Sequence, residues 1–178
     1  FRTLLDSEVY KRRFMKTRCA WCEKDDLYRK YHDEEWGIPV YEDVKLFEFL
    51  ILETFQAGLS WHTILKKREG FRVAFDNFDY KIIANYSEDK IQELMLDAGI
   101  IRNQLKIRSA VSNAIAFMKV QDEFGSFSKY IWSYVHGKPI DNKRKTLQEV
   151  PATTPLSDTI SKNLKQRGFK FVGSTVVY

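Results

Sequence analysis

Cysteine, histidine and long apolar runs are all scarce in this chain. Its 178 residues include 2 Cys and 3 His, and no stretch reaches the roughly 18 consecutive apolar residues of a membrane-spanning helix. The first residues also lack the apolar block of a signal peptide. These absences argue against a membrane protein and against a disulfide-stapled secreted domain, so we expect a cytoplasmic protein.

The two cysteines form one short motif, Cys19-Ala-Trp-Cys22. In a reducing compartment this spacing is typical of metal ligation or redox chemistry. A tetrahedral zinc site needs four ligands. His32 is the histidine nearest to the motif in the sequence, whereas His62 and His136 are not spaced as partners. Metal binding and an inert, reduced cysteine pair therefore both stay open.

Charge and aromatic content give the first indication of a partner. The net charge is +5 and the pI is about 9.1, which favours a polyanion such as nucleic acid, although simple solubility explains the same balance. Aromatic residues make up 15% of the chain, a content that suits stacking on flat ligands. The hydrophobic content of 44% supplies an ordinary globular core.

Apolar residues recur at helical spacing along most of the chain, and no segment shows a convincing strand pattern. We therefore predict an all-α fold, with an N-terminal extension over residues 1–16 and one domain over 17–178. Caps and apolar faces predict helices at 43–57, 60–67, 71–78, 87–98, 103–118, 128–135 and 157–167. The first is apolar on nearly every side, which predicts a buried central helix capped by Asp43 and ended by Gly58.

A short connection, Gly99-Ile100-Ile101-Arg102, joins two of these helices. Gly99 can take a positive φ, and the next helix, capped by Asn103, presents free backbone amides that suit a phosphate. Arg102, Lys106 and Arg108 lie at or just beyond the turn, so the hairpin would hold a DNA backbone without reading its sequence. Most turns of this kind merely pack two helices together, and that alternative stays open.

Glu53 is the least expected polar residue of the predicted central helix. Its neighbours are almost all apolar, and ionised carboxylates are rarely buried without a reason. A structural role, paired with a helix cap or a buried arginine, is one explanation; an acidic floor to a binding pocket beside Trp61 is the other. Further aromatics, Trp21, Tyr28 and Tyr31, suit stacking on a cationic purine, whereas we assign Trp36 to the core.

Several ordered motifs, taken together, resemble the DNA-3-methyladenine glycosylase I family over residues 17–178. The motifs are Arg18-Cys19, Tyr28-x-x-Tyr31-His32-Asp33-Glu34-Glu35-Trp36-Gly37, Gln56-Ala57-Gly58-Leu59-Ser60-Trp61 and Lys165-Gln166-Arg167-Gly168-Phe169-Lys170-Phe171-Val172-Gly173. The resemblance implies a helix-hairpin-helix glycosylase fold, with a hairpin element over about residues 87–120 and a small zinc-binding region joining the two ends of the chain. It also implies release of 3-methyladenine from alkylated double-stranded DNA by a monofunctional enzyme. The sequence says nothing about oligomeric state, and we take a monomer as the default.

The same resemblance implies roles for individual residues. Glu53 matches the family's base-contacting carboxylate, which we take as the catalytic residue, and four aromatics match its base pocket: Trp21, Tyr28, Tyr31 and Trp61. Cys19 and His32 match two zinc ligands, and the other two, a His and a Cys, would lie beyond Tyr178. The predicted contacts to the DNA backbone are Gly99, Ile100, Ile101, Arg102 and Lys106. Two other classes fit parts of the pattern: a non-catalytic DNA-binding module and a zinc-stabilised protein-interaction domain.

Overall fold

The structure, a computed structural model, describes residues 18–144 and 146–178, and the predicted extension over residues 1–16 lies outside them. The chain divides into two compact units, Phe1–Ile38 and Pro39–Tyr178. Within the described residues every regular element is a helix, which confirms the all-α prediction. None of these helices is long and apolar enough to cross a membrane. The prediction of one domain over 17–178 stays a prediction.

The described part of the first unit holds a 3-10 turn, η1 (Ala20–Cys22), and one helix, α2 (Asp26–Glu34). The side chain of Asp25 caps α2 by accepting from the amide of Tyr28 at 2.9 Å. This cap fixes the start of the helix, so Tyr28 and Tyr31 lie one turn apart on it.

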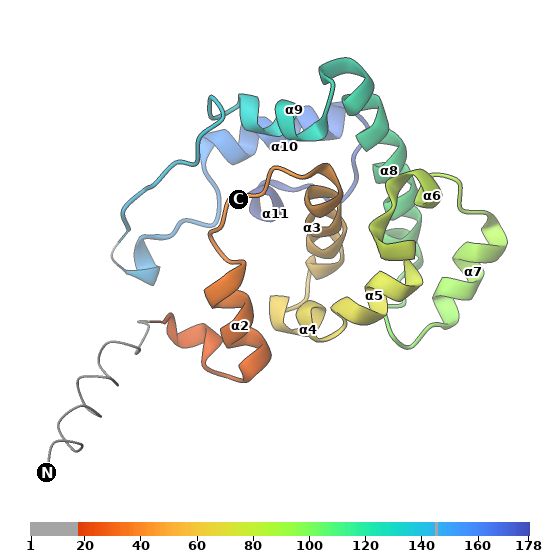
Figure 1. The fold of residues 1–178 in the computed structure, drawn as a ribbon, viewed down its shortest axis with the longest axis horizontal. Helices are drawn as coiled ribbons and strands as arrows, with labels where there is room; N and C mark the ends of the chain where they lie inside the picture. Colours follow the sequence, from red (N-terminus) through yellow and green to blue (C-terminus); the bar gives the residue numbers. More distant parts are fainter. Residues whose placement is uncertain (1–17, 145) are drawn as a thin grey trace, which may run out of the picture. The chain divides into compact units, whose positions relative to one another are not determined.

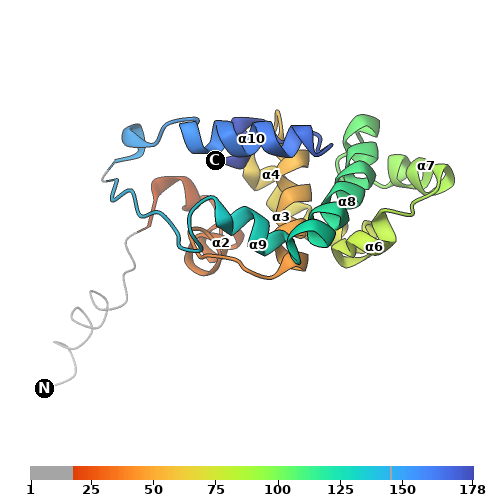
Figure 2. The same ribbon diagram turned by 90° about the horizontal axis from the view of Figure 1, so that it is seen from above.

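The second unit contains the other helices, and the colours of Figure 1 follow their order along the chain. They are α3 (Asp43–Gln56), α4 (Trp61–Lys66), α5 (Arg68–Ala74), η2 (Asp76–Phe78), α6 (Tyr80–Ile83), α7 (Glu88–Leu96), α8 (Gln104–Phe124), α9 (Phe127–Ser133), η3 (Leu147–Glu149), α10 (Pro155–Gln166) and α11 (Ser174–Val177). Figures 1 and 2 both show α7 on the side of α8 that faces away from α3.

Helix α3 is the buried centre of this unit, as predicted. It packs against α4, α8 and α9. Its side chains Phe47, Ile51, Leu52, Thr54 and Phe55 are all 0% exposed. The helix ends at Gln56, and Gly58 follows with φ of +81°. Because only glycine takes that conformation at little cost, the turn from α3 into α4 depends on it.

The predicted cap of α3 is wrong. Glu42 occupies the cap position without a side-chain hydrogen bond, and Asp43 is already the first helical residue. The Asp43 carboxylate instead accepts from the amides of Phe127 at 2.9 Å and Ser128 at 2.8 Å. It therefore stabilises the start of α9, because the first amides of a helix have no partner within it.

Three predicted caps are confirmed. Ser60 accepts from the amide of Thr63 in α4, Ser87 caps α7, and Asn103 caps α8. The helix predicted over 71–78 is shorter than expected: α5 ends at Ala74 and a 3-10 turn follows. Two other predicted helices are shifted, since Ser126 caps α9 and Thr154 caps α10 with Pro155 in its first turn.

Gly99 does not have the positive φ that we predicted. Its backbone lies against α5 instead: a Cβ added to Gly70 would come within 2.5 Å of the Gly99 carbonyl oxygen. Lys67 donates to the carbonyl of Ala98 at 2.7 Å. The close approach of the two backbones therefore explains the glycine at position 70, whereas a Cβ on Gly99 would come within 2.9 Å of the Asp97 carboxylate oxygen.

Candidate functional site

A cluster of partly exposed aromatic rings joins η1 to α2 in the first unit. Trp21 of η1 lies 4.8 Å from Tyr28 and 6.5 Å from Tyr31 between ring centroids, and the two tyrosines are 6.4 Å apart. Burial raises the pKa of Tyr28. The structure thus brings together the three aromatics of this unit that the sequence analysis assigned to base binding.

Trp36 is not a core residue, contrary to our assignment. It is 50% exposed, stacks on His32 at 5.2 Å and meets Trp21 edge-on at 5.4 Å. The aromatic cluster therefore extends from Trp21 through His32 to a half-exposed indole, a surface on which a flat ligand can stack.

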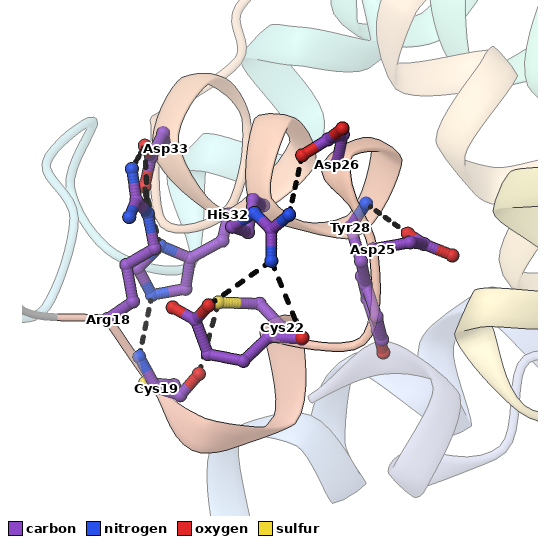
Figure 3. A network of polar contacts seen from close by, with 10 residues as sticks. Arg18, Cys19, Cys22, Asp25, Asp26, Tyr28, His32 and Asp33 are labelled. Atoms are coloured by element: carbon purple, nitrogen blue, oxygen red, sulfur yellow. Dashed lines mark hydrogen bonds and ion pairs between the residues drawn. The ribbon is translucent and has the colours of Figure 1, made fainter.

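Polar contacts fix the orientation of His32 (Figure 3). Arg18 holds the Asp33 carboxylate through Nε at 3.0 Å and Nη2 at 2.8 Å, and Asp33 Oδ1 lies 3.0 Å from His32 Nδ1. The other ring nitrogen, Nε2, accepts from the Cys19 amide at 3.4 Å. A carboxylate on one imidazole nitrogen is the usual support for a histidine that binds metal through the other.

The residues present nevertheless do not make a complete zinc site. Cys19 and His32 are brought together, as the resemblance implied, but Cys22 is fully buried and its thiol donates to the Cys19 carbonyl. In the part of the chain that the structure describes, no group of three or more Cys, His, Asp or Glu side chains could hold a metal. A four-ligand site does not fit this set.

In the second unit, Glu53 lies on α3 among buried residues. The carboxyl group makes no hydrogen bond or ion pair with any described residue. Burial raises its pKa to about 7, and no charged neighbour contributes to the shift. A carboxyl group in this setting is poised between its neutral and ionised forms near neutral pH, which is typical of functional sites.

Trp61, the other predicted residue of this unit, begins α4, which packs against α3. Its ring stacks on Phe49 of α3 with centroids 6.4 Å apart. Lys45 and Arg68 lie over the Phe49 ring at 5.2 and 5.3 Å. These contacts restrict the Trp61 indole, because Phe49 packs against it and the two cations in turn limit the rotamers of Phe49.

A buried ion-pair network underlies these contacts. Glu48 is 6% exposed and accepts from Arg68 Nε at 2.6 Å, Arg72 Nη2 at 2.9 Å and Lys45 Nζ at 2.9 Å. Sequence reasoning missed Glu48, Phe49 and Arg68. The available signal was a second carboxylate on the same apolar helix, with Lys45 one turn before it.

Lys106 has a structural role that the sequence analysis did not foresee. Its side chain is 6% exposed, and Nζ donates to the carbonyls of Phe55 at 2.8 Å and Ala57 at 2.5 Å. Its amide donates to the Asn103 side chain. The ammonium group therefore satisfies the last carbonyls of α3, the helix that carries Glu53, and burial lowers its pKa.

The connection between α7 and α8 is held on two sides. Ile100 is buried in the core, and the Gly99 amide donates to the Asp97 carboxylate at 2.6 Å. The amides of Ile101 and Arg102 have no acceptor among the described residues, and the Arg102 side chain is exposed. Two amides and one guanidinium group are thus available to an anion at this turn.

Comparisons with known proteins agree on one family. The family model described as methyladenine glycosylase matches residues 21–178. DNA-3-methyladenine glycosylase 1 of Escherichia coli (strain K12) is 46% identical over 161 residues, which cover 90% of this chain and 86% of that protein. The crystal structure of a 3-methyladenine DNA glycosylase I superposes with a TM-score of 0.88 at 46% identity, covering 91% of this chain and 89% of that one.

A second solved structure concerns recognition of the base itself. It is a 3-methyladenine DNA glycosylase I from Staphylococcus aureus, described as showing the structural basis of 3-methyladenine recognition. It superposes with a TM-score of 0.87 at 40% identity and covers 90% of this chain and 85% of that one. Since the family model and a relative at 46% identity both span nearly the whole chain, this protein belongs to the methyladenine glycosylase family.

Proposed function

We propose that this protein is a DNA glycosylase that hydrolyses the N-glycosidic bond of 3-methyladenine in alkylated double-stranded DNA. The observation that carries the proposal is Glu53, a buried carboxyl group with no cationic partner among the described residues. Membership of the methyladenine glycosylase family and the recognition of 3-methyladenine by the Staphylococcus aureus relative support it.

Charge explains why such a carboxylate suits this base. Methylation at N3 leaves the purine positively charged, and an ionised carboxylate accepts hydrogen bonds but cannot donate them. Ionised Glu53 therefore favours a base that combines donor groups with positive charge, and the base supplies the counter-charge that no described residue offers Glu53. Burial strengthens this attraction, because the local dielectric constant is lower than that of water.

The methylated purine is already a good leaving group, so the enzyme need not protonate it. The target nucleotide is first turned out of the DNA stack, at a cost of a few kcal/mol. Water then adds to C1′ of the sugar as the bond from C1′ to N9 breaks. The bonding pair neutralises the base, and the proton of the water passes to solvent. Glu53 stabilises the positive charge that develops on the sugar.

The aromatic residues of each unit help to select the cationic methylated base over neutral purines. Trp61 and the cluster of Trp21, Tyr28 and Tyr31 offer faces on which a cationic ring gains about 0.5–2 kcal/mol per contact. A neutral purine gains less from the same faces and from Glu53. Recognition therefore depends on the charge of the lesion. No lysine nucleophile enters the scheme, and we propose a monofunctional enzyme without a lyase step.

The α7–α8 connection acts as the helix-hairpin-helix element of the proposed enzyme. The amides of Ile101 and Arg102 and the side chain of Arg102 bind a phosphate of the DNA backbone. We leave Lys106 out of this contact, because both its ammonium group and its amide already have partners within the protein. Gly99 contributes through its close packing on Gly70.

Zinc stays a prediction, as do the cytoplasmic location and the monomeric state. Cys19 and His32 are two of the ligands that the family resemblance implies, and no step above uses a metal. Metal analysis of the purified protein, beside a Cys19→Ser variant, tests the zinc prediction. Zinc that is present in the parent and lost in the variant would support the site.

Chromatographic detection of bases released from methylated duplex DNA tests the proposed activity. The parent chain should release 3-methyladenine, and Glu53→Gln should slow release roughly 10- to 100-fold, since the amide oxygen of glutamine still accepts a hydrogen bond but lacks the negative charge that strengthens it. Glu123→Gln, at an exposed pair with Arg167, is the matched control and should release at the parent rate.

Two results would contradict the proposal. Unchanged release by Glu53→Gln removes the role of that residue. A folded parent protein that binds duplex DNA but releases no base would instead be the non-catalytic DNA-binding module considered from the sequence.

A further inference from the structure

The motif around Gly168-Phe169-Lys170-Phe171 has no part in the base site proposed above, yet buried side chains and hydrogen bonds fix its backbone in place. Phe169 and Val172 are each 1% exposed in the core. Between them, the buried Asn113 of α8 holds Lys170 on both backbone groups: Oδ1 accepts from its amide at 2.7 Å, and Nδ2 donates to its carbonyl at 3.2 Å. The loop is thus clamped to α8 with the side chains of Lys170 and Phe171 exposed.

Phe171 is strained as well as exposed. Its φ is +55° and its side chain is 38% exposed. The left-handed conformation is uncommon for a bulky residue, and an exposed phenylalanine gains little from burial to offset it. Such strain persists where the surrounding structure imposes it, and it concentrates at binding sites.

The loop and α8 together form a groove of about 460 Å³, lined by Leu105, Arg108, Ser109, Ser112, Lys170 and Phe171. Leu105 is 70% exposed. Arg108 pairs with Glu88 at 2.5 Å, with side chains 43% and 56% exposed; pairs this exposed exchange readily with another anion. The groove therefore combines apolar side chains with two accessible cations.

The groove also continues the anion site at the α7–α8 connection. Arg102 belongs to that connection, and Leu105 lies in the first turn of α8 directly after it. From Leu105 to Ser112 the helix advances about 10 Å, and one DNA strand advances about 3.4 Å per nucleotide along the axis. The lining of α8 thus matches about three nucleotides of a single strand.

We propose that this groove is a second contact for the sugar-phosphate backbone of the strand held at the α7–α8 connection. Lys170 and Arg108 bind phosphates, and the rings and methyl groups of Phe171 and Leu105 lie against the deoxyriboses. The contact is independent of base sequence, as a repair enzyme that searches whole genomes requires. The proposal rests on the proposed function, because DNA is its ligand.

Salt dependence of DNA binding is the sharpest test. The full chain would be titrated with a duplex that carries a stable abasic-site analogue, at several salt concentrations. Lys170→Gln should lower the slope of log affinity against log salt by about 0.9, the value for one phosphate contact. Lys119→Gln, at an exposed lysine of α8 that does not line the groove, should leave the slope unchanged.

Phe171→Asn tests the apolar half. Asparagine tolerates the left-handed conformation, so the loop is kept while the ring is removed. Affinity for the duplex should fall several-fold with an unchanged salt slope, and the melting temperature should hold or rise. Ile82→Ala, at an exposed apolar residue of α6, should change neither the affinity for the duplex nor the melting temperature. If Phe171 is only structural, the melting temperature falls instead.

The failures of the two proposals can be told apart. A parent protein that neither releases 3-methyladenine nor binds the duplex overturns the proposed function. A parent that does both, with Lys170→Gln retaining the parent slope, overturns the groove contact alone. The lysine variant decides this even if Phe171→Asn does not fold.

Discussion

Two glutamates of the same helix, Glu48 and Glu53 of α3, have opposite surroundings. Glu48 accepts from Arg68, Arg72 and Lys45, whereas Glu53 has no ion pair with a described residue. Burial tends to raise the pKa of Glu48, but hydrogen bonds from Arg68 and Lys45 outweigh it and hold that pKa below the usual value. At Glu53 burial acts alone and raises the pKa to about 7.

The difference separates a structural carboxylate from a functional one. A buried charge must be compensated, and the fold compensates Glu48 with three cations. It offers Glu53 none among the described residues, so a cationic ligand can become the partner. Glu48 therefore stabilises the fold, while Glu53 costs stability that base recognition offsets.

Glu48→Gln, which removes the structural carboxylate of this comparison, should have the largest effect on stability. Removing one charge leaves Arg68, itself 6% exposed, without its carboxylate. We expect a loss of about 3–5 kcal/mol in the free energy of unfolding, measured by urea denaturation at pH 7. Glu123→Gln, at a solvent-exposed pair with Arg167, should lose far less stability, because solvent screens that pair. Equal losses in the two variants would show that the buried network contributes no more to the free energy of unfolding than the exposed pair does.

Glu53→Gln should have the opposite effect on stability. A carboxyl group whose folded pKa of about 7 lies above the ordinary 4.5 binds its proton more tightly in the native state. Its stabilising contribution is full below pH 4.5 and is lost as the pH rises through 7. The gap between 4.5 and about 7 corresponds to about 3 kcal/mol, so the glutamine variant should exceed the parent by up to that amount at pH 8.

The measurement is urea denaturation of both proteins from pH 5 to pH 8. Glu48→Gln provides a control of opposite sign, because a lowered pKa stabilises the fold above pH 4.5 and loses that effect as the pH falls. A parent that stays as stable as Glu53→Gln at pH 8 would mean that Glu53 is solvated or paired after all.

The same comparison shows what the sequence could predict. Helical periodicity and caps identified α3, α4, α7 and α8, because those signals are local. Glu53 stood out because a lone carboxylate interrupts an apolar helix. Glu48 interrupts the same helix, but its partners Arg68 and Arg72 come from α5. Only the folded chain could show that one carboxylate has charged partners and that the other has none among the described residues.

Long-range contacts also explain the wrong predictions. Asp43 looked like a cap for its own helix, but its carboxylate serves α9, far along the chain. Gly99 looked like a left-handed turn, but its φ is not positive, and its carbonyl oxygen lies where a side chain at Gly70 would stand. Lys106 looked like a phosphate ligand, but α3 already engages its ammonium group. In each case the residue type was informative, and its partner lay on a different element.

The pH dependence of base release sharpens the comparison on the functional side. Only ionised Glu53 carries the negative charge that attracts a cationic base, and its ionised fraction falls about tenfold for each pH unit below its pKa. Because kcat/KM reports the free enzyme, kcat/KM for 3-methyladenine release should rise with pH up to about 7 and level off above it. Glu53→Gln, which cannot ionise, should show a low, flat profile.

The experiment is base release from methylated duplex at limiting enzyme from pH 5.5 to pH 8.5, at constant ionic strength and with spontaneous release subtracted. Constant ionic strength matters because binding to the DNA backbone depends on salt. Glu48→Gln, assayed where it is folded, should keep the parent profile, since its pKa lies well below this range. A flat parent profile between pH 6 and pH 8 would place the ionisation of Glu53 outside that interval and remove the charge argument for its role.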